Sequence, residues 1–462
     1  MNQGLTRREL LRRGFFSAGL VAGGSLLWGC KDNDSDGRTS GRLSRAARYR
    51  VPKLREQPDA NGLLLPEGFS SRVIAQSAMN AGGMLMPLPF FPDGASTFPD
   101  PQAPGGWIHV VNSEVPNLNG LVGLTGLPLP SLTIPSLPLL SGGVYAFRFD
   151  PQGNLTSAYP LLTGSSTNCA GGTTPWGTWI SCEEIENGTS FEVHPLGQGS
   201  IDGVSYPVRL DSLGIFQHEA AALDPANRHV YLTEDQGDGR FYRLVAEDRR
   251  PWDGSVKIDL TRGRLQVAQV LGDDPAATRA VLWHDVPNPL GGSSEPTRAQ
   301  VAASTPFDGG EGCFYREGIV YFTSKGDNRV WAYDTERALL DLIYDDDRFA
   351  EPLLTGVDNL IATPEGHLLI AEDGGDMQIV VITVAREIAP LAQAPGQTSS
   401  EITGLSLTPD GRRLYFASQR WGDIRIPIPE PLGEALGLPL SGDTGGGIIY
   451  EIRRDDGRRI FG

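Results

Sequence analysis

Hydrophobic and polar positions alternate in short runs along most of the chain, and residues 215–244 show this pattern most clearly. The small-residue run Ala220–Leu223 and the apolar run Val230–Leu232 flank Asp224-Pro225-Ala226-Asn227, whose residue types favour a tight turn. Runs of this length joined by a turn predict a β-hairpin. A third strand is expected over Arg240–Leu244, so the segment contains three consecutive strands.

Three later segments repeat the turn and second strand of this hairpin. They are Arg316–Thr323, Pro364–Ala371 and Pro409–Ala417, and their glycines at positions 318, 366 and 411 are 48 and 45 residues apart. Four-stranded propeller blades recur at this spacing. We therefore expect an all-β fold, a six-bladed β-propeller, whose final strand Gly447–Arg453 closes the ring against an N-terminal segment. The six hairpins begin with an acidic or polar residue: Asp93, Asn168-Cys169, Glu219, Glu311, Asp358 and Glu401.

A second set of acids follows the second strand of several hairpins. These residues are Glu114, Glu183-Glu184, Glu234-Asp235 and Glu372-Asp373. In an antiparallel hairpin the start of the first strand lies beside the end of the second. The innermost strands of a propeller line its channel, so the carboxylates are expected to meet at one channel mouth. Such a cluster favours bound cations; the alternative for any single acid is a solvated turn residue.

Two hairpins carry basic residues where the second acid is expected. Ser324-Lys325 follows the Glu311 strand pair, and Ser418-Gln419-Arg420 follows the Glu401 pair. A basic side chain beside bound cations is a place for an anion. Lys325 and Arg420 are therefore candidate anion-binding residues.

Composition supports this interpretation of the acids. The chain has 39 basic and 56 acidic residues, a net charge of −17, with 58 glycines and 35 prolines. Many turns between short strands agree with that glycine and proline content. The charge argues against a nucleic-acid partner, because no basic stripe is available for phosphates.

The N-terminal segment resembles an export signal. Arg7-Arg8 precedes a short apolar run that ends at Cys30, as in a twin-arginine signal with a lipoprotein cleavage site. We assign residues 1–30 to the signal, 31–60 to a flexible linker and 61–462 to the propeller. The implied location is the periplasm or cell surface, with a possible lipid anchor at Cys30. An ordinary cleaved signal with an incidental cysteine is the alternative.

Cysteine and histidine offer fewer indications. Cys169 stands at a blade entrance, where a thiolate suits a softer ion such as iron. A disulfide with Cys182 or a buried free thiol are the alternatives, and Cys313 is the remaining cysteine outside the signal. His218 precedes Glu219, so strand alternation turns its side chain away from the channel.

Several long motifs resemble the PhoX family of exported alkaline phosphatases. The resemblance covers roughly residues 86–462, and the motifs occur in the family's order. They are Asn168–Glu184, His218–Ala221 with Tyr231–Asp235, Phe307–Gly312, Asp358–Leu360 and Ala371–Gly374.

This resemblance implies a six-bladed propeller with an iron and calcium cluster (Fe³⁺ and Ca²⁺) that hydrolyses phosphate monoesters. By position, the iron-side ligands are Cys169, Glu219 and Glu311, and the calcium-side ligands are Glu184, Asp358 and Glu372. Glu234 and Asp373 complete the candidate metal ligands. The expected partner is a small phosphoester substrate, and the protein is expected to be a monomer.

Two positions depart from the family pattern. The family has a phosphate-contacting arginine two residues before the glutamate matched by Glu311, where this chain has Gly309. The first-blade motif, often Asn-His-Glu, is Asn112-Ser113-Glu114 here. Our hypothesis is that Arg420 or Lys325 supplies the missing positive charge.

Two other functions agree with the same residues. One is a non-catalytic calcium-binding propeller, and the other is a calcium-dependent lactonase or esterase. No nucleophile elbow of the type Gly-x-Ser-x-Gly is present. The apolar, proline-rich insertion at residues 115–140 is expected either to cover the channel mouth or to pack against the propeller side.

Overall fold

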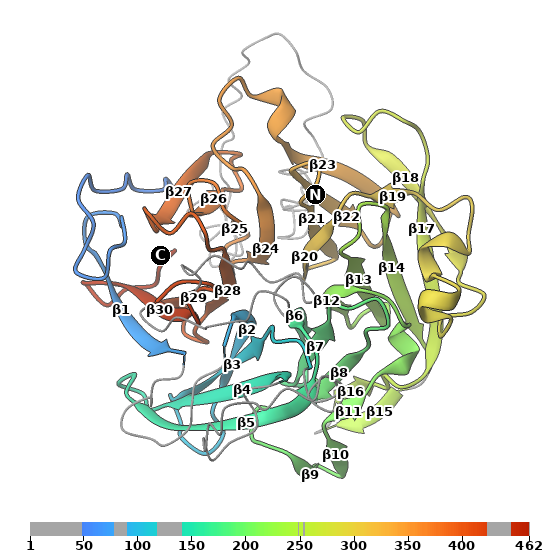
Figure 1. Ribbon diagram of the computed structural model, residues 1–462, viewed down its shortest axis with the longest axis horizontal. Coiled ribbons are helices and arrows are strands. Elements are labelled where there is room, and N and C mark those ends of the chain that lie inside the picture. The colour runs from blue at the N-terminus through green and yellow to red at the C-terminus, as the bar shows by residue number, and fades with distance from the viewer. Residues whose placement is uncertain are drawn as a thin grey trace, which may run out of the picture.

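The computed structural model describes residues 49–77, 90–117, 141–247, 249–252, 255–422 and 445–461. In these residues, six four-stranded antiparallel blades surround a central channel (Figure 1). The innermost strands β2, β6, β12, β20, β24 and β28 contact one another in a closed ring. The predicted all-β, six-bladed β-propeller is therefore confirmed.

The blades follow one another along the chain. Blade 1 consists of β2 (Pro92–Pro99), β3 (Trp107–Ser113), β4 (Gly142–Phe149) and β5 (Leu155–Ser165). Blade 2 consists of β6 (Asn168–Thr173), β7 (Trp179–Glu183), β8 (Ser190–Val193) and β11 (Val208–Arg209). Blade 3 consists of β12 (His218–Asp224), β13 (His229–Glu234), β14 (Gly239–Ala246) and β17 (Gly263–Val270).

Blade 4 consists of β20 (Gly310–Arg316), β21 (Ile319–Ser324), β22 (Arg329–Asp334) and β23 (Leu339–Asp345). Blade 5 consists of β24 (Val357–Ala362), β25 (Leu368–Glu372), β26 (Gln378–Ile382) and β27 (Ile388–Gln393). Blade 6 consists of β28 (Ile402–Leu407), β29 (Arg413–Ser418), β30 (Ile448–Arg454) and β1 (Phe69–Gln76).

Additional short elements decorate the blades. β18 (Arg279–Asp285) pairs with β17 and with β23, and so joins blades 3 and 4 into one larger sheet. The other short strands are β9 (Gly199–Ile201), β10 (Val204–Tyr206), β15 (Arg249–Trp252), β16 (Ser255–Ile258) and β19 (Pro306–Phe307). The 3₁₀ helices are η3 (Asp211–Leu213), η4 (Gly292–Ser294), η5 (Thr297–Ala299) and η6 (Asp346–Arg348).

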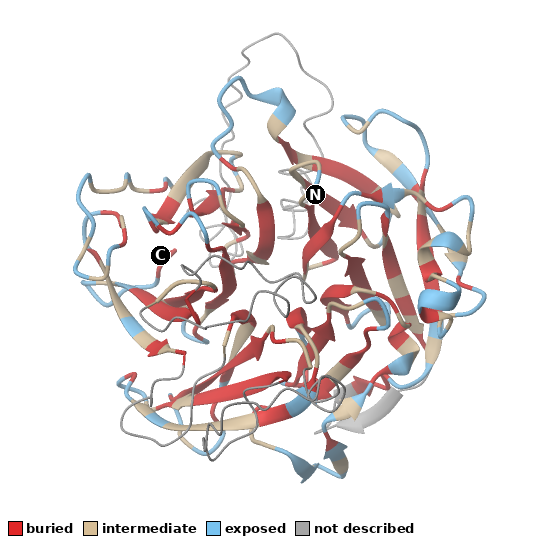
Figure 2. Ribbon diagram, viewed as in Figure 1, coloured by how far each residue is buried: buried red, intermediate tan, exposed pale blue. Residues whose placement is uncertain are grey.

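Apolar side chains fill the spaces between neighbouring blades. Each of the six interfaces has its own core, such as Phe147 of blade 1 with Tyr415 of blade 6, or Phe241 of blade 3 with Phe322 of blade 4. The inner and middle strands are accordingly buried, and exposure is concentrated in peripheral loops (Figure 2). Because both faces of a blade are covered, strands such as β26 (QIVVI) are apolar at nearly every position.

The ring closes by pairing the first strand with the last. β1 runs antiparallel to β30, from Phe69 opposite Arg454 to Gln76 opposite Ile448. The predicted closure is therefore present. On β30, the fully buried Glu451 accepts hydrogen bonds from Arg72 at 2.7 and 2.9 Å, from Arg413 at 2.6 Å and from Tyr415 at 2.8 Å.

The folded part of the chain begins earlier than the sequence analysis expected. Residues 49–60 were assigned to the flexible linker, but Val51 is buried with the core between blades 5 and 6. The ring of Tyr49 packs against His367 and Phe461. The reason is that a few apolar side chains in this polar stretch pack on an apolar surface of blades 5 and 6, which is distant in sequence and cannot be inferred from the local residues.

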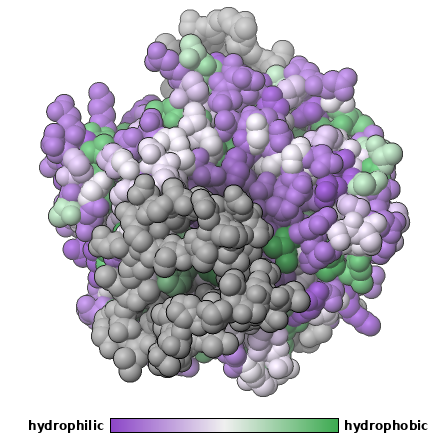
Figure 3. Space-filling model, viewed as in Figure 1, coloured by the Kyte–Doolittle hydropathy of each residue, from purple (hydrophilic) through white to green (hydrophobic). Residues whose placement is uncertain are grey.

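Other predicted segments lie outside the described residues. These are the signal over residues 1–30, the linker over 31–48 and most of the proline-rich insertion, residues 118–140. Among the described residues, no helix has the length and apolarity needed to cross a membrane. Hydrophilic residues cover much of the visible face outside the grey segments (Figure 3).

We predict that the ion pairs of Glu451 stabilise the closed ring. Glu451→Gln removes the charge opposite two arginines, and it should lower the free energy of unfolding by about 3 kcal/mol. Asp410→Asn is the control, because its pair with Arg412 is exposed and should matter by less than about 0.5 kcal/mol. Urea unfolding followed by tryptophan fluorescence measures both changes. Equal effects of the two substitutions would contradict the prediction.

Candidate functional site

A β-bulge sits at the channel-mouth end of the inner strand in each of the six described blades. The pairing with the second strand shifts there, for example between His218 and Ala221 in blade 3. A bulge redirects a side chain that would otherwise continue the alternation. In five blades, the residues that follow the pair before this shift are Asp93, Cys169, Glu219, Glu311 and Asp358.

Blade 6 differs from the other five blades. Thr403, the residue after the first pair of β28, is itself paired with Ala417, and the shift follows it. Glu401 stands two residues earlier, in a β-bridge with Asp373 of blade 5. The sequence analysis placed Glu401 at the entrance of this hairpin as the sixth equivalent acid. The structure brings Glu401 to the same mouth, but from a different position in the blade.

The second strands contribute the residue immediately after their last paired residue. The last paired residues turn toward their own blades: Glu372 accepts hydrogen bonds from the backbone of Thr355 and Gln378, both at 2.9 Å. Glu234 accepts from Tyr242 at 2.7 Å and pairs with Arg298 at 3.2 Å. The following residues in the six blades are Glu114, Glu184, Asp235, Lys325, Asp373 and Gln419.

Three groups of potential ligand atoms form in this mouth. Within each group the atoms lie within 4.8 Å of one another. The groups are Cys169, Glu184 and Glu219; Glu219, Glu311 and Asp358; and Asp358, Asp373 and Glu401. Six of the predicted metal ligands thus lie together, with Glu401 added, whereas Glu234 and Glu372 lie outside the groups. Because Glu219 and Asp358 are each shared, the three groups form one continuous centre.

The charge balance of the mouth is strongly negative. Burial, followed by repulsion from Glu311 and Glu184, raises the pKa of Glu219 well above its usual value. Burial likewise raises the pKa of Glu311, despite the attraction of Lys325. Nine carboxyl groups face two cationic side chains here: Asp93, Glu114, Glu184, Glu219, Asp235, Glu311, Asp358, Asp373 and Glu401 against Lys325 and Arg420.

Cations fit this arrangement. One oxygen of Asp93, Oδ1, is buried without a hydrogen-bond partner, and the residue as a whole is 5% exposed. Buried carboxylates at this density must bind either protons or cations. Carboxylate oxygens are the ligands that Ca²⁺ prefers, and the group that includes Cys169 adds a sulfur for a softer ion.

Cys169 is a free thiol in the structure, as are Cys182 and Cys313. The alternative of a disulfide between Cys169 and Cys182 is therefore wrong for this structure. Burial, together with Glu219 and Glu184, raises the pKa of the Cys169 thiol well above its usual value. Its sulfur lies 3.1 Å from the carbonyl oxygen of His218. The thiol is thus protonated unless a nearby cation stabilises the thiolate.

His218 points away from the channel, as strand alternation predicts. Its Nε2 lies 3.0 Å from the carbonyl oxygen of Gly214, and its ring stacks on Phe216 at 3.7 Å. Burial lowers the pKa of His218 to about 4, so the ring is neutral near pH 7. It therefore supports the strand that carries Glu219.

The two predicted basic residues both reach the acidic mouth. The Nζ of Lys325 lies 2.7 Å from Glu311, 3.4 Å from Asp373 and 3.6 Å from Asp358. Burial opposes its charge, but these carboxylates outweigh the effect and raise the pKa of Lys325. Arg420 pairs with Glu401 at 2.8 Å. Both side chains remain partly exposed, at 32% and 25%, so an incoming anion can reach them.

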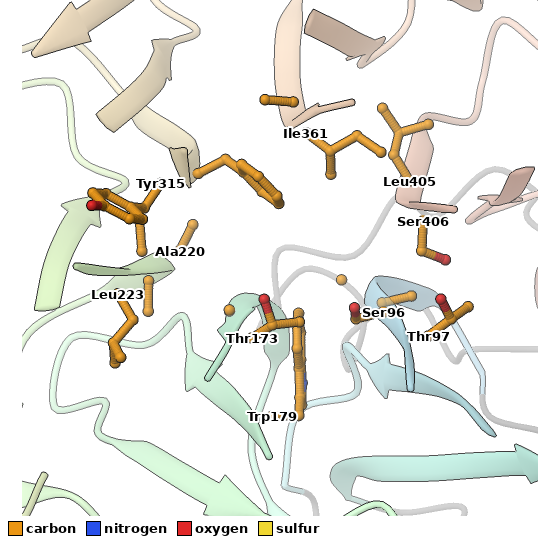
Figure 4. A pocket seen from close by; sticks show the side chains of 18 of the residues that line it. Ser96, Thr97, Thr173, Trp179, Ala220, Leu223, Tyr315, Ile361, Leu405 and Ser406 are labelled. Atoms are coloured by element: carbon orange, nitrogen blue, oxygen red, sulfur yellow. The ribbon is translucent and has the colours of Figure 1, made fainter. Parts of the chain in front are cut away.

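Below the acidic mouth, the channel continues as a cavity of about 630 Å³. Its walls come from the inner strands of several blades and carry small, apolar and hydroxyl side chains, including Ser96, Thr173, Ala220, Ile361 and Leu405 (Figure 4). No carboxyl group lines it. The acidic residues therefore occupy one end of the channel, and Arg316 is the charged residue among those that line the cavity.

The fold and the site define a β-propeller with an acidic channel mouth. The family model for alkaline phosphatase PhoX matches residues 152–422, more than half of the chain, and the chain belongs to this family. No curated protein sequence matches the chain.

Solved structures share the fold. Pseudomonas fluorescens PhoX, in a complex with the transition-state analogue vanadate, is 18% identical with a TM-score of 0.66. The alignment covers 89% of this chain and all of that one. A Xanthomonas campestris gluconolactonase is more distant, with a TM-score of 0.44 and 10% identity over 88% of this chain and 99% of its own.

We predict that neighbouring residues at the end of β25 have separate roles. Asp373→Asn should reduce the metal content of the protein, because Asp373 belongs to one of the ligand groups, and it should change stability little. Glu372→Gln should retain the metal but destabilise the fold by about 2 kcal/mol, because one of two buried backbone N–H groups loses its acceptor. Metal analysis after gel filtration and thermal unfolding in chelator measure the two effects. Loss of metal in Glu372→Gln, with lower stability in Asp373→Asn, would contradict this division of roles.

Proposed function

We propose that this protein is an exported phosphatase that hydrolyses small phosphate monoesters with calcium and iron bound in the channel mouth. The observation that carries the proposal is the continuous set of three ligand groups beside two cationic side chains. Membership of the PhoX family supports phosphatase chemistry.

The ligand groups differ in the ions that they favour. Cys169, Glu184 and Glu219 would hold the iron, because theirs is the group that contains sulfur. This differs from the division that the family resemblance implies, since Glu184 moves to the iron side and Glu311 to the calcium side. The other two groups offer only oxygen and would hold calcium. When bound, the cations would neutralise phosphoryl oxygens and make a coordinated water more acidic.

Lys325 and Arg420 would bind the anionic substrate. They approach the carboxylates from blades 4 and 6, and each is exposed enough to meet a ligand. When phosphate binds, Lys325 and Arg420 would each replace a carboxylate partner with a phosphoryl oxygen. Their attraction for the phosphoryl group strengthens as negative charge develops in the transition state.

The position of Lys325 supports its role as a substitute for the family's arginine. The position expected to carry that arginine is Gly309, whose carbonyl oxygen accepts a hydrogen bond from the Lys325 backbone at 2.7 Å. A side chain at position 309 would begin 3.8 Å from the Cβ of Lys325. Lys325 thus starts from nearly the same place as the missing arginine.

Hydrolysis of an aryl phosphate by the purified protein tests the proposed activity. Chelation should abolish turnover and calcium should restore it, with iron and calcium present in the same sample. Bound metal without turnover would favour the alternative functions, a non-catalytic calcium-binding propeller or an esterase that acts on another substrate. A protein that binds neither ion would contradict the whole proposal.

We predict that the two cationic residues contribute to turnover. Lys325→Met and Arg420→Ala should each lower kcat/KM by about 10²-fold or more, because charge in the transition state loses a partner. Arg412→Ala is the matched control, since Arg412 is 62% exposed on the β28–β29 turn at the other end of the blade. Metal content should stay unchanged in all three variants. A loss as small as that of the control would exclude a role in phosphate binding.

The export assignment also remains part of the proposal. Residues 1–30 would direct export through the twin-arginine pathway, with Cys30 as the lipid attachment site and a monomeric product. Replacing Arg7 and Arg8 with lysine should retain the protein in the cytoplasm. Fractionation of cells that express the two forms measures this, and unchanged export would refute the signal.

A further inference from the structure

Asp358 holds a central place in the acidic mouth. It belongs to two of the three ligand groups, so the orientation of its carboxylate affects both. Its two oxygens have different surroundings. Oδ2 lies 3.6 Å from the Nζ of Lys325, on the side of the other carboxylates. Oδ1 accepts a hydrogen bond from the Nδ2 of the neighbouring residue Asn359 at 2.8 Å.

Asn359 also connects two blades. Its Oδ1 accepts a hydrogen bond at 3.0 Å from the backbone N–H of Gly404 on β28, in blade 6. The orientation of the amide follows from its partners, because a backbone N–H only donates and a carboxylate only accepts. Asn359 is buried, at 7% exposure. Its side chain is therefore fixed at both ends between blade 6 and Asp358.

Three hydrogen bonds between neighbouring blades hold backbone carbonyl groups rather than a carboxylate. Thr323 of blade 4 donates to the backbone carbonyl of Asp358 at 2.6 Å, and Thr403 of blade 6 donates to that of Pro92 at 2.7 Å. Asn112 of blade 1 donates to the carbonyl of Cys169 at 2.7 Å. All three hold the backbone near a bulge. Asn359 instead contacts the carboxylate oxygen itself.

We propose that Asn359 is a positioning residue that orients Asp358 for cation binding. By occupying Oδ1 it directs Oδ2 toward the shared ligand groups, and its contact with Gly404 ties that orientation to the closed ring. This inference rests on the proposed cation-dependent function. Residues that orient metal ligands in this way commonly change metal affinity 10- to 100-fold when they are replaced.

The test compares two substitutions in the full chain. Asn359→Leu removes both side-chain hydrogen bonds at similar volume, whereas Thr323→Val removes the bonds to the backbone carbonyls of Asp358 and Gly312 and leaves the Asp358 carboxylate untouched. Calorimetric titration of the chelator-treated proteins with Ca²⁺ measures affinity, and thermal unfolding in chelator measures stability. We expect Asn359→Leu to weaken Ca²⁺ binding at least 10-fold. Thr323→Val should lower the unfolding midpoint and keep the affinity within about 2-fold.

Excess calcium supplies an independent readout. If Asn359 acts through Asp358, the Ca²⁺ concentration for half-maximal phosphatase activity rises in Asn359→Leu, while activity at saturating Ca²⁺ returns to within about 3-fold of wild type. Asn359→Ser, which is too short to reach both partners, replaces Asn359→Leu should the latter not fold. The same affinity criterion applies to it.

The outcomes separate this inference from the proposed function. Wild-type Ca²⁺ affinity in the Asn359 variants would overturn the positioning role and leave the phosphatase proposal intact. Equal losses of affinity in the Asn359 and Thr323 variants would also overturn it, because a general loosening of β24 would then explain the effect. A wild-type protein that binds no Ca²⁺ would overturn both proposals.

Discussion

Repulsion between buried carboxylates is the constraint on which the rest of this structure depends. Left to themselves, nine acids at one channel mouth would separate. Six apolar interfaces between blades, together with the paired first and last strands, keep them close. The packing of the blades therefore opposes the repulsion between these carboxylates, and cations bound at the mouth would reduce that repulsion. We infer that metal binding and ring stability are linked, since the free energy gained at the mouth also stabilises the interfaces.

Much of this architecture could be predicted from the sequence because propeller blades repeat. The glycines at 318, 366 and 411 marked the period, and the acids at matched positions marked the channel mouth. These signals can be recognised in a single sequence because each depends on a local turn or a strand end. The number of blades, the closing strand and most of the acidic cluster therefore followed from pattern alone.

What the sequence did not reveal depends on bulges and on distant partners. Glu234-Asp235 and Glu372-Asp373 are adjacent acids, and only the register of the second strand decides which one faces its own blade. Glu401 is a second case, since it precedes β28 and reaches the mouth through a β-bridge with Asp373 of blade 5. Residues 49–60 appeared to be a linker because their apolar surface partner is more than 300 residues away in sequence, at Phe461 and His367. Strand alternation can resolve the first case, but the other two require the fold.

Closure by the first and last strands has a consequence for how the protein is made. β1 must wait for β30, so blade 6 cannot form until nearly the whole chain has left the ribosome. Contacts at such long sequence separation are slow to form. Until then the N-terminal strand lacks its partner, and the carboxylates of blades 1 and 6 are not held opposite one another. Two of the three ligand groups lie within blades 2 to 5, so closure of the ring completes the mouth by bringing Asp93 and Glu114 of blade 1 opposite Glu401 of blade 6.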